Sequence, residues 1–214
     1  LLQVTNGTVR LVAGNVPLCL TTGAVADASI AYSASAAAGS RFSAVTNRAT
    51  HPMIFVSWYG AAAFCNDQST RENLSPVYNT NGWSAALAED GYRLPLEAEW
   101  LKAAAWDDAA MVFRVYGTGK DSVAATEINY LGSGDEWEGA SVGTSPAGTY
   151  PLTSPAGLKD ASGNVWEWCH GFYDSGDSDP DLHAHAARGG SWGNLVGDIK
   201  AATRTGFKPE MTLS

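Results

Sequence analysis

The chain has 214 residues, of which 45% are hydrophobic and 16% are charged, and its formal net charge is −9. This length is ample for a substantial core, and the hydrophobic fraction excludes a disordered chain. With 13 Lys and Arg residues against 22 Asp and Glu residues, the chain lacks a basic surface for phosphate backbones, so we expect no nucleic-acid partner. Its apolar stretches are too short and too often interrupted to predict a membrane span.

The start of the chain and its cysteines leave the cellular compartment open. Leu1-Leu2-Gln3 carries neither a basic region nor a cleavage site, so no signal peptide is predicted. The three cysteines, Cys19, Cys65 and Cys169, are scattered and form no Cys-x-x-Cys motif. An odd count leaves one thiol free or partnered outside the chain. We therefore assign no localisation, and an exported or cell-surface protein is compatible with the sequence.

Residues 1–50 are rich in Ala, Ser, Thr, Gly and Val and have almost no carboxylates. Short β-like runs such as residues 9–12 alternate there with Gly-Asn and Thr-Gly turn signals. We predict that this zone forms an irregular lid over the core and not a separate domain.

Residues 51–106 carry the clearest helix signals. After the strand-like residues 53–56, Ser57 is a plausible N-cap for a helix through residues 58–65. A second helix is predicted after Pro95, which suits a first helical turn.

The second helix has two further supports in the sequence. Glu97 and Glu99 place negative charge near its N-terminus, where the helix dipole favours it. Trp100, Ala103 and Ala104 lie at positions i, i+3 and i+4, which predicts one apolar face.

Residues 107–214 are dense in Gly, Asp, Ser and Pro, which predicts loops and short strands. Two helices early and a long irregular stretch late favour an α+β fold over a βαβ repeat. His183 and His185 have a spacing compatible with a metal on a strand, but no third ligand is indicated, so we interpret them as part of a solvated loop.

An acidic turn stands out between Asp160 and Trp168. Asp160 and Glu167 offer carboxylates, and Gly163 permits a tight turn that directs backbone carbonyls inward. A hard cation such as Ca²⁺ takes six to eight oxygen ligands, and such a loop can supply several. The alternative is a tryptophan-anchored turn whose acids cap backbone amides or pair with Arg, and spacing alone favours this second interpretation.

A second motif runs from Arg188 to Asn194, with Gly189 and Gly190 at its centre. The glycine pair lets two backbones approach closely. Trp192 is interpreted either as a core residue or as the wall of a pocket, and sequence alone favours the core.

Together these motifs resemble the formylglycine-generating-enzyme family, also called the sulfatase-modifying-factor family. The shared segments follow the family's order over residues 51–209; they are His51-Pro52, 56–59, 64–66, 76–79, 91–100, 163–168 and 188–192. Val4-Thr5-Asn6 is also similar to an early signature of the family.

The resemblance implies a variant of the C-type lectin fold, with two helices, short antiparallel strands and much irregular loop. It implies one domain over residues 1–214, and in the family a further strand precedes residue 1 and another follows residue 214.

The resemblance also implies two structural calcium sites. Asp160 and Glu167 match ligands that act through side chains, and Gly163 and Val165 match ligands that act through carbonyls. A second site would include Asn129 and Tyr130. There Gly139 occupies the position of the family's acid, so Glu138 or Asp135 would have to substitute.

One departure from the family bears on activity. Its enzymes oxidise a substrate cysteine to formylglycine with oxygen and a copper ion held by two cysteines just after the Gly-Gly-Ser motif. Here Asn194 and either Val196 or Ile199 occupy those positions, and no cysteine follows Cys169. Soft thiolates stabilise Cu(I) in a way that amide or aliphatic side chains do not, so we expect no copper site.

The sequence therefore favours a non-catalytic module that binds or displays a protein or small-molecule ligand. Variable proteins of diversity-generating retroelements use this fold, and residues 204–209 lie in the corresponding region. The alternative is a formylglycine-generating oxidase or a related oxygenase. The predicted ligand-binding residues surround the former catalytic groove and are Trp192, Asn194, Leu195, Asp198, Thr203, Thr205 and Phe207.

Overall fold

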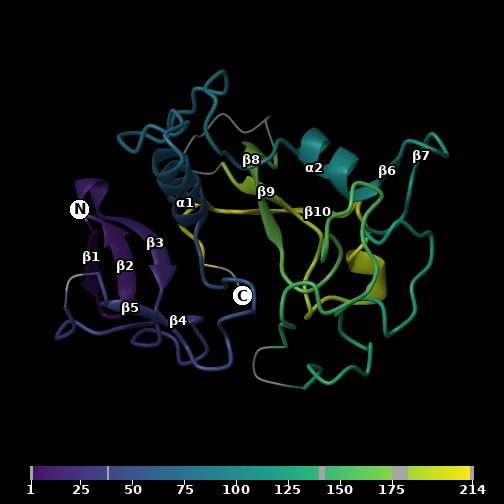
Figure 1. Cartoon of the computed structure of the whole chain (residues 1–214), viewed down its shortest axis with the longest axis horizontal. Coiled ribbons are helices and arrows are strands. Elements are labelled where there is room, and N and C mark those ends of the chain that lie inside the picture. The colour runs from purple at the N-terminus through teal and green to yellow at the C-terminus, as the bar shows by residue number, and fades with distance from the viewer. Residues whose placement is uncertain (1, 38, 140–142, 175–182, 213–214) are drawn as a thin grey trace. The chain divides into compact units, whose positions relative to one another are not determined.

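The computed structural model describes residues 2–37, 39–139, 143–174 and 183–212. Its contacts group the chain into two compact units, which we describe separately. Unit 1 comprises residues 1–49, 53–94 and 208–214, and unit 2 comprises residues 50–52 and 95–207. Figure 1 shows the order of the helices and strands along the chain.

Unit 1 contains two small antiparallel sheets and one long helix. The first sheet has the order β1-β2-β3, and the second pairs β4 with β5. The helix α1 contacts β3 (Figure 1). The elements are β1 (Leu2–Thr5), β2 (Thr8–Leu11), the 3₁₀ turn η1 (Ala13–Asn15), β3 (Val16–Leu20), β4 (Ile30–Tyr32), β5 (Phe42–Ala44) and α1 (Trp58–Arg71).

The start of α1 follows from its local sequence. The Ser57 side chain accepts a hydrogen bond from the Gly60 amide at 3.0 Å, which confirms the predicted N-cap. The Ser57 hydroxyl also donates to the Pro17 carbonyl at 2.6 Å and so ties the helix start to β3. Trp58 is fully buried and packs edge-on against Tyr78 at the centre of unit 1.

Two predictions for the first half of the chain were wrong. Residues 1–50 form two regular sheets and not an irregular lid, because their short β-branched runs pair with one another locally. Residues 53–56 form no strand. Phe55 has a φ of 55°, which interrupts an extended backbone, and only Val56 makes an isolated bridge, to Cys19.

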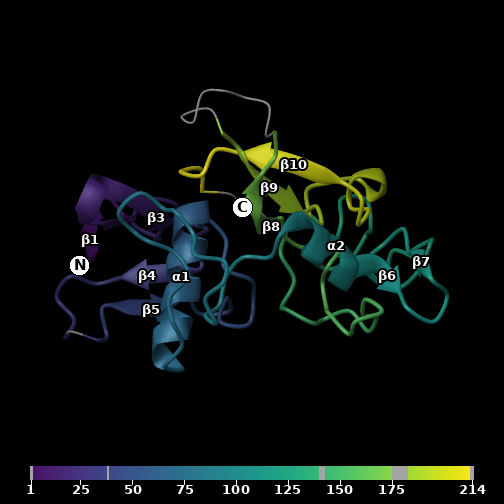
Figure 2. The same cartoon turned by 90° about the horizontal axis from the view of Figure 1, so that it is seen from above.

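Unit 2 contains a three-stranded antiparallel sheet of order β10-β9-β8, with α2 against one face, as Figure 2 shows from above. A short hairpin of β6 and β7 follows α2. Its elements are α2 (Glu97–Ala105), β6 (Trp106–Asp107), β7 (Val112–Phe113), β8 (Glu167–Phe172), β9 (His185–Arg188), the 3₁₀ turn η3 (Val196–Asp198) and β10 (Arg204–Phe207).

The core of unit 2 lies between α2 and the sheet. Trp100 and Ala104 of α2 pack against Cys169 of β8 and Ala186 of β9, all of them buried. The predicted apolar face of α2 is thereby confirmed for these two positions. The helix begins at Glu97, two residues later than Pro95, and the Glu99 carboxylate accepts the Leu96 amide at 2.8 Å to cap it.

The α+β fold class is correct: two helices and short antiparallel strands are joined by long irregular segments. None of the helices in the described part of the chain is both long and apolar enough to cross a bilayer.

Candidate functional site

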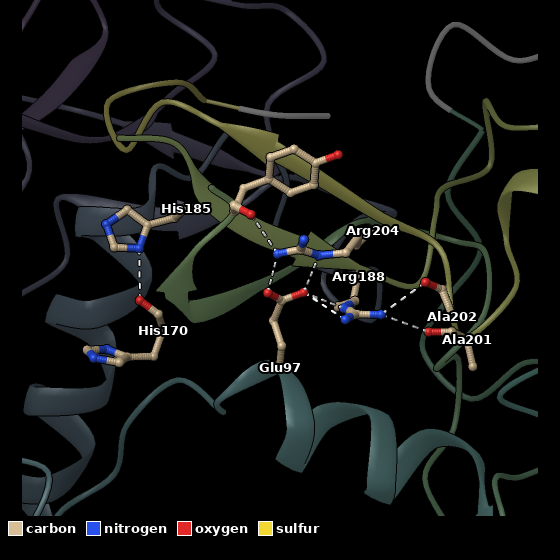
Figure 3. A network of polar contacts seen from close by, with 8 residues as sticks. Glu97, His170, His185, Arg188, Ala201, Ala202 and Arg204 are labelled. Atoms are coloured by element: carbon tan, nitrogen blue, oxygen red, sulfur yellow. Dashed lines mark hydrogen bonds and ion pairs between the residues drawn. The ribbon is translucent and has the colours of Figure 1, made fainter. Parts of the chain in front are cut away.

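The candidate site lies in unit 2, on the strands β8 to β10 and the loops that connect them. A partly buried ion-pair network holds these strands against α2. The Arg188 guanidinium on β9 reaches the Glu97 carboxylate from Nε at 2.8 Å and Nη2 at 2.7 Å. Arg204 on β10 binds the same carboxylate through Nε at 2.8 Å and Nη2 at 2.6 Å (Figure 3). One acid of α2 therefore joins two strands.

The network also fixes the segment before β10. Arg188 Nη1 donates to the carbonyls of Ala201 and Ala202, at 3.3 and 3.1 Å. Arg204 lies over the Tyr173 ring, 4.4 Å from its centroid, and donates to the Tyr173 carbonyl at 2.8 Å. These contacts hold the chain on both sides of Thr203, one of the predicted ligand-binding residues.

Two charges decide the state of Glu97. Burial raises the pKa of this carboxyl, but the hydrogen bond from Arg204 and the positive charges of Arg188 and Arg204 outweigh burial, so its pKa lies below its ordinary value. Glu97 is therefore ionised at neutral pH, and its network is charged throughout.

The loop after β9 is closed by hydrogen bonds within a single turn. The Asn194 side-chain oxygen accepts from both the amide and the hydroxyl of Ser191, each at 2.9 Å. The Asn194 carbonyl accepts the Leu131 amide at 2.9 Å. In this predicted ligand-binding residue, both the side-chain oxygen and the backbone carbonyl therefore accept hydrogen bonds that hold the loop.

The far end of the same loop is anchored by the packing of one buried side chain. Ile199 is fully buried with Tyr116 and Ile128, and it lies against Gly190 so closely that a Cβ there would come within 2.7 Å of the Ile199 side chain. Between these two anchors, Leu195 is 58% exposed and Asp198 is exposed. The loop therefore presents an apolar and an acidic side chain on a rigid support.

Trp192 has features of both interpretations drawn from the sequence. Its side chain is half-buried, and its ring lies against Gly143, where a Cβ would come within 2.7 Å of Cε3. The indole Nε1 is buried and has no hydrogen-bond partner in the described part of the chain.

The remaining predicted ligand-binding residues lie on or beside β10. Thr205 and Phe207 alternate with Arg204 along the strand, so they face away from α2, and Phe207 contacts the rings of Trp166 and Trp168. Thr203 precedes the strand and is half-buried. The predicted set thus divides into an exposed loop and a half-buried strand face.

The first predicted calcium set lies at the turn that leads into β8. Asp160 accepts the Gly148 amide at 2.6 Å, and Glu167 accepts the Trp100 indole N–H at 2.6 Å. At Gly163, with φ of 75°, a Cβ would lie 2.2 Å from the Asn129 carbonyl oxygen, so only glycine fits this close approach. Val165 is half-buried beside this turn.

Glu167 is a half-buried acid that has no cationic partner among the described residues. In the described part of the chain, no Lys or Arg forms an ion pair with it. Burial, together with the negative charge of Asp160 and partly offset by the indole hydrogen bond, raises the pKa of Glu167 to about 7. A cation at this carboxylate would supply the missing charge, so the first set fits a hard metal ion.

The second predicted calcium set fits less well. Both oxygens of Glu138 accept backbone amides, from Gly132 and Gly134. Asp135 accepts the amides of Trp137 and Glu138 and the Tyr150 hydroxyl. The acids that would substitute for Gly139 therefore already cap turns.

The backbone at Asn129 and Tyr130, the other members of that set, is occupied as well. The Asn129 carbonyl accepts the Asn164 amide at 3.0 Å, and the Tyr130 carbonyl accepts the Ser133 amide at 3.1 Å. No group of three or more His, Cys, Asp or Glu side chains with a metal-binding arrangement occurs among the described residues.

The interpretation of His185 as part of a solvated loop was wrong. His185 is buried at the start of β9, because that strand pairs with both β8 and β10, and its Nδ1 lies 2.9 Å from the His170 carbonyl (Figure 3).

Asn164 is a central residue that sequence reasoning missed. It is buried with φ of 61°, its side-chain oxygen accepts the Ser145 amide at 3.0 Å, and its Nδ2 donates to the Ser145 carbonyl at 3.3 Å. Its own carbonyl accepts the Trp192 amide at 2.9 Å. The Gly-Asn pair in the sequence was a signal for the turn, but not for its long-range partners.

All three cysteines are free thiols. Burial raises the pKa of Cys169 to about 12 and that of Cys19 to about 11, and it also raises the pKa of Cys65. Cys169 is fully buried on β8. None of the three is poised to be a thiolate ligand at neutral pH.

With this fold and site, the chain belongs to the family described as the sulfatase-modifying factor enzyme 1-like domain, whose model matches residues 3–214. The resemblance drawn from the motifs is thus confirmed.

Among curated proteins, the chain is similar to the chaperone protein LppX of Paenibacillus barcinonensis, at 30% identity over 68% of this chain and 60% of that protein. It is similar to the inactive C-alpha-formylglycine-generating enzyme 2 of Bos taurus, at 28% identity over 78% of this chain and 49% of that protein. It also matches the hercynine oxygenase of Mycobacterium tuberculosis, at 44% identity over 39% of this chain and 18% of that enzyme. The chain thus spans only part of the relatives it matches.

Among solved structures, variable protein 1 of Treponema denticola superposes with a TM-score of 0.63 at 22% identity, over 90% of this chain and 76% of that one. At this identity the match shows a shared fold.

Proposed function

We propose that this chain is a ligand-binding module on the formylglycine-generating-enzyme scaffold that does not oxidise cysteine by the copper mechanism. The observation that carries the proposal is the replacement of the copper thiols by Asn194 and by Val196 or Ile199. The Asn194 oxygen is committed to Ser191, and the Ile199 side chain is fully buried. Neither offers the soft sulfur ligand that Cu(I) requires.

The exposed loop supports the binding part of the proposal. Leu195 and Asp198 stand on a segment fixed at one end by the Ser191–Asn194 turn and at the other by Ile199. Variable side chains on a rigid support are a common basis of recognition sites, because little conformational entropy is lost when the ligand binds. The similarity in fold to a variable protein and in sequence to an inactive relative agrees with this function.

A copper titration tests the non-oxidising part of the proposal. We expect the chain to take no Cu(I) from a competing chelator, and to produce no aldehyde from a Cys-x-Pro-x-Arg peptide. Stoichiometric uptake of Cu(I) together with aldehyde product would overturn the proposal.

A selection experiment tests the binding part. Peptides selected from a random library against the chain should lose binding to a Leu195→Ala/Asp198→Ala double variant. They should retain binding to Phe64→Ala, which removes a 64% exposed side chain on α1. Peptides that bind all three proteins equally, or no selected peptide at all, would contradict the placement of the site.

We further propose that the site at Asp160, Gly163, Val165 and Glu167 binds calcium as a structural ion. Its support is the half-buried Glu167 carboxylate, whose one side-chain partner among the described residues is the Trp100 indole N–H. When bound, the ion would supply positive charge beside this acid. Asp160 and Glu167 would act through side chains and the other two residues through carbonyls.

A second candidate function is an oxygenase of which this chain forms one part, favoured by the local identity to a hercynine oxygenase. The chain has four histidines, and His183 and His185 join no metal-binding group among the described residues. Oxygen consumption by the iron-supplemented chain with hercynine and a thiol tests this candidate; we expect none.

A further inference from the structure

A cavity of about 560 Å³ lies in unit 2 at the C-terminal end of α2, apart from the loop and strand described above. One wall is a single face of the helix and its continuation, formed by Glu99, Lys102, Ala103 and Trp106. The cavity is also lined by Asp108 and by Pro155-Ala156, which come from outside the helix. Its size is within the range of small-molecule sites.

The aromatic surface of this cavity is held in one orientation. The Trp106 indole N–H donates to the Asp108 carboxylate at 2.6 Å, so the ring edge is fixed. Phe113, its partner across the β6–β7 hairpin, packs on the same ring with centroids 4.9 Å apart. A ring fixed in this way offers a preorganised flat apolar face to a ligand.

The polar groups around that ring carry both signs of charge and have capacity to spare. The Lys102 ammonium forms no hydrogen bond or ion pair with another described residue. The Asp108 carboxylate uses one oxygen for the indole and keeps the other. Asp107, in contrast, is saturated by Arg114 and by two backbone amides, so its role is structural.

This combination selects the chemistry of the ligand. The Lys102 ammonium would repel a small cation, and the Asp108 carboxylate would repel an anion. A purely apolar ligand would remove water from both charged groups without replacing their hydrogen bonds to it. A free amino acid could satisfy both charges, but it is much smaller than the cavity. A sugar ring has hydroxyls that accept from an ammonium and donate to a carboxylate, and C–H faces that stack on an indole.

We propose that this cavity binds a neutral carbohydrate of one or two sugar rings, with the ring stacked on Trp106 and hydroxyls bonded to Lys102 and Asp108. This site is independent of the proposed function at residues 192–207. Since the proposed polar contacts come from only Lys102 and Asp108, we expect the dissociation constant for the sugar to be in the millimolar range.

NMR of the tryptophan indole N–H signals in the intact chain tests the proposal. The chain has eight tryptophans, and a Trp106→Phe variant identifies the Trp106 indole signal by its loss while a ring is kept. Trp192→Phe identifies the Trp192 signal in the same way. Glucose, N-acetylglucosamine, lactose, maltose and cellobiose, each added to about 20 mM, are the probes.

We expect at least one of these sugars to shift the Trp106 signal and to leave the Trp192 signal in place. Lys102→Met, an exposed position on the helix, should raise the dissociation constant about tenfold by removing a charged hydrogen bond. Lys200→Met, an equally exposed lysine elsewhere in unit 2, is the matched control and should leave it unchanged.

Three results would overturn the proposal. They are no shift of the Trp106 signal with any of the sugars, a shift confined to Trp192, and equal affinity of the Lys102→Met variant and the unchanged chain. A tri-lysine peptide that shifts the Trp106 signal where the sugars do not would show that the cavity binds cations instead.

Discussion

Two acids lie between α2 and the β10-β9-β8 sheet of unit 2, and they differ in the positive charge around them. Among the described residues, Glu97 receives two guanidinium groups, from Arg188 and Arg204, whereas the Glu167 side chain receives only the indole N–H of Trp100. As a result the pKa of Glu97 is lowered and that of Glu167 is raised to about 7. Arginines on β9 and β10 compensate the negative charge of Glu97. The negative charge of Glu167 on β8 is compensated by a proton or by an added cation.

The largest expected effect on stability comes from removing the Arg188 partner of Glu97. Arg188→Met leaves Glu97 partly buried with one partner fewer and frees the carbonyls of Ala201 and Ala202. We expect a loss of about 3–5 kcal/mol in the free energy of unfolding, measured by urea denaturation. Arg71→Met, which breaks an exposed pair with Asp67, is the control and should change it by less than about 0.5 kcal/mol. Equal losses in both variants would mean that the buried network has no special weight.

The second prediction concerns pH on the uncompensated side. The folded state holds the Glu167 proton up to a pKa of about 7, above the ordinary value of 4.5. Between these two values the folded chain binds more protons than the unfolded chain, so this group's contribution to stability falls as the pH rises. In EDTA we expect a loss of about 3 kcal/mol from this group across that window.

Urea unfolding at several pH values, with Glu167→Gln alongside, measures this contribution. The variant should lack the decline between pH 4.5 and about 7, because glutamine has no proton to release. Glu97 has the opposite sign: its lowered pKa gives stability that is lost as the pH falls through its folded value. A decline that persists unchanged in Glu167→Gln would mean that another group is responsible.

Calcium provides a third test of the same acid. At a hundredfold excess over its dissociation constant, an ion that binds only the folded chain adds about 2.7 kcal/mol to the free energy of unfolding. We expect this gain at neutral pH in the unchanged chain and in Glu138→Gln, and its loss in Glu167→Gln. A gain that disappears in Glu138→Gln and persists in Glu167→Gln would locate the ion at the second set instead.

The smallest effect is expected at the outer partner of the compensated side. Arg204 is more exposed than Arg188, with 39% of its side chain accessible against 9%. Solvent screens its pairing with Glu97, so Arg204→Ala should cost about 1 kcal/mol, part of it from the lost stacking on Tyr173. A loss as large as that of Arg188→Met would show that Glu97 depends on both arginines equally.

The sequence predicted the features that depend on neighbouring residues. Ser57 caps α1 because its hydroxyl meets the amide of Gly60, three residues later. The face of α2 that carries Trp100 and Ala104 follows from helical periodicity. The family and its α+β fold followed from motifs that stand in the right order.

Partners distant in the chain were beyond sequence reasoning. Glu97 was interpreted as a helix-dipole residue, but its charge is bound by arginines 91 and 107 positions away. Asn164 lies in the turn predicted between Asp160 and Trp168, but it also bonds the backbone at Ser145 and Trp192. The short runs in residues 1–50 gave strand signals too weak to show that they pair into sheets.

The sequence alone determined the scaffold and the absence of cysteines at the two copper positions, because both are matters of residue type and order. Tertiary structure decided which groups remain available for binding. The Asn194 side-chain oxygen is bonded within its own turn, and Leu195 and Asp198 are left exposed on the loop. Glu167 has no cationic partner among the described residues. The physical reason is that hydrogen-bond capacity and charge compensation depend on distances between segments, which residue order does not specify.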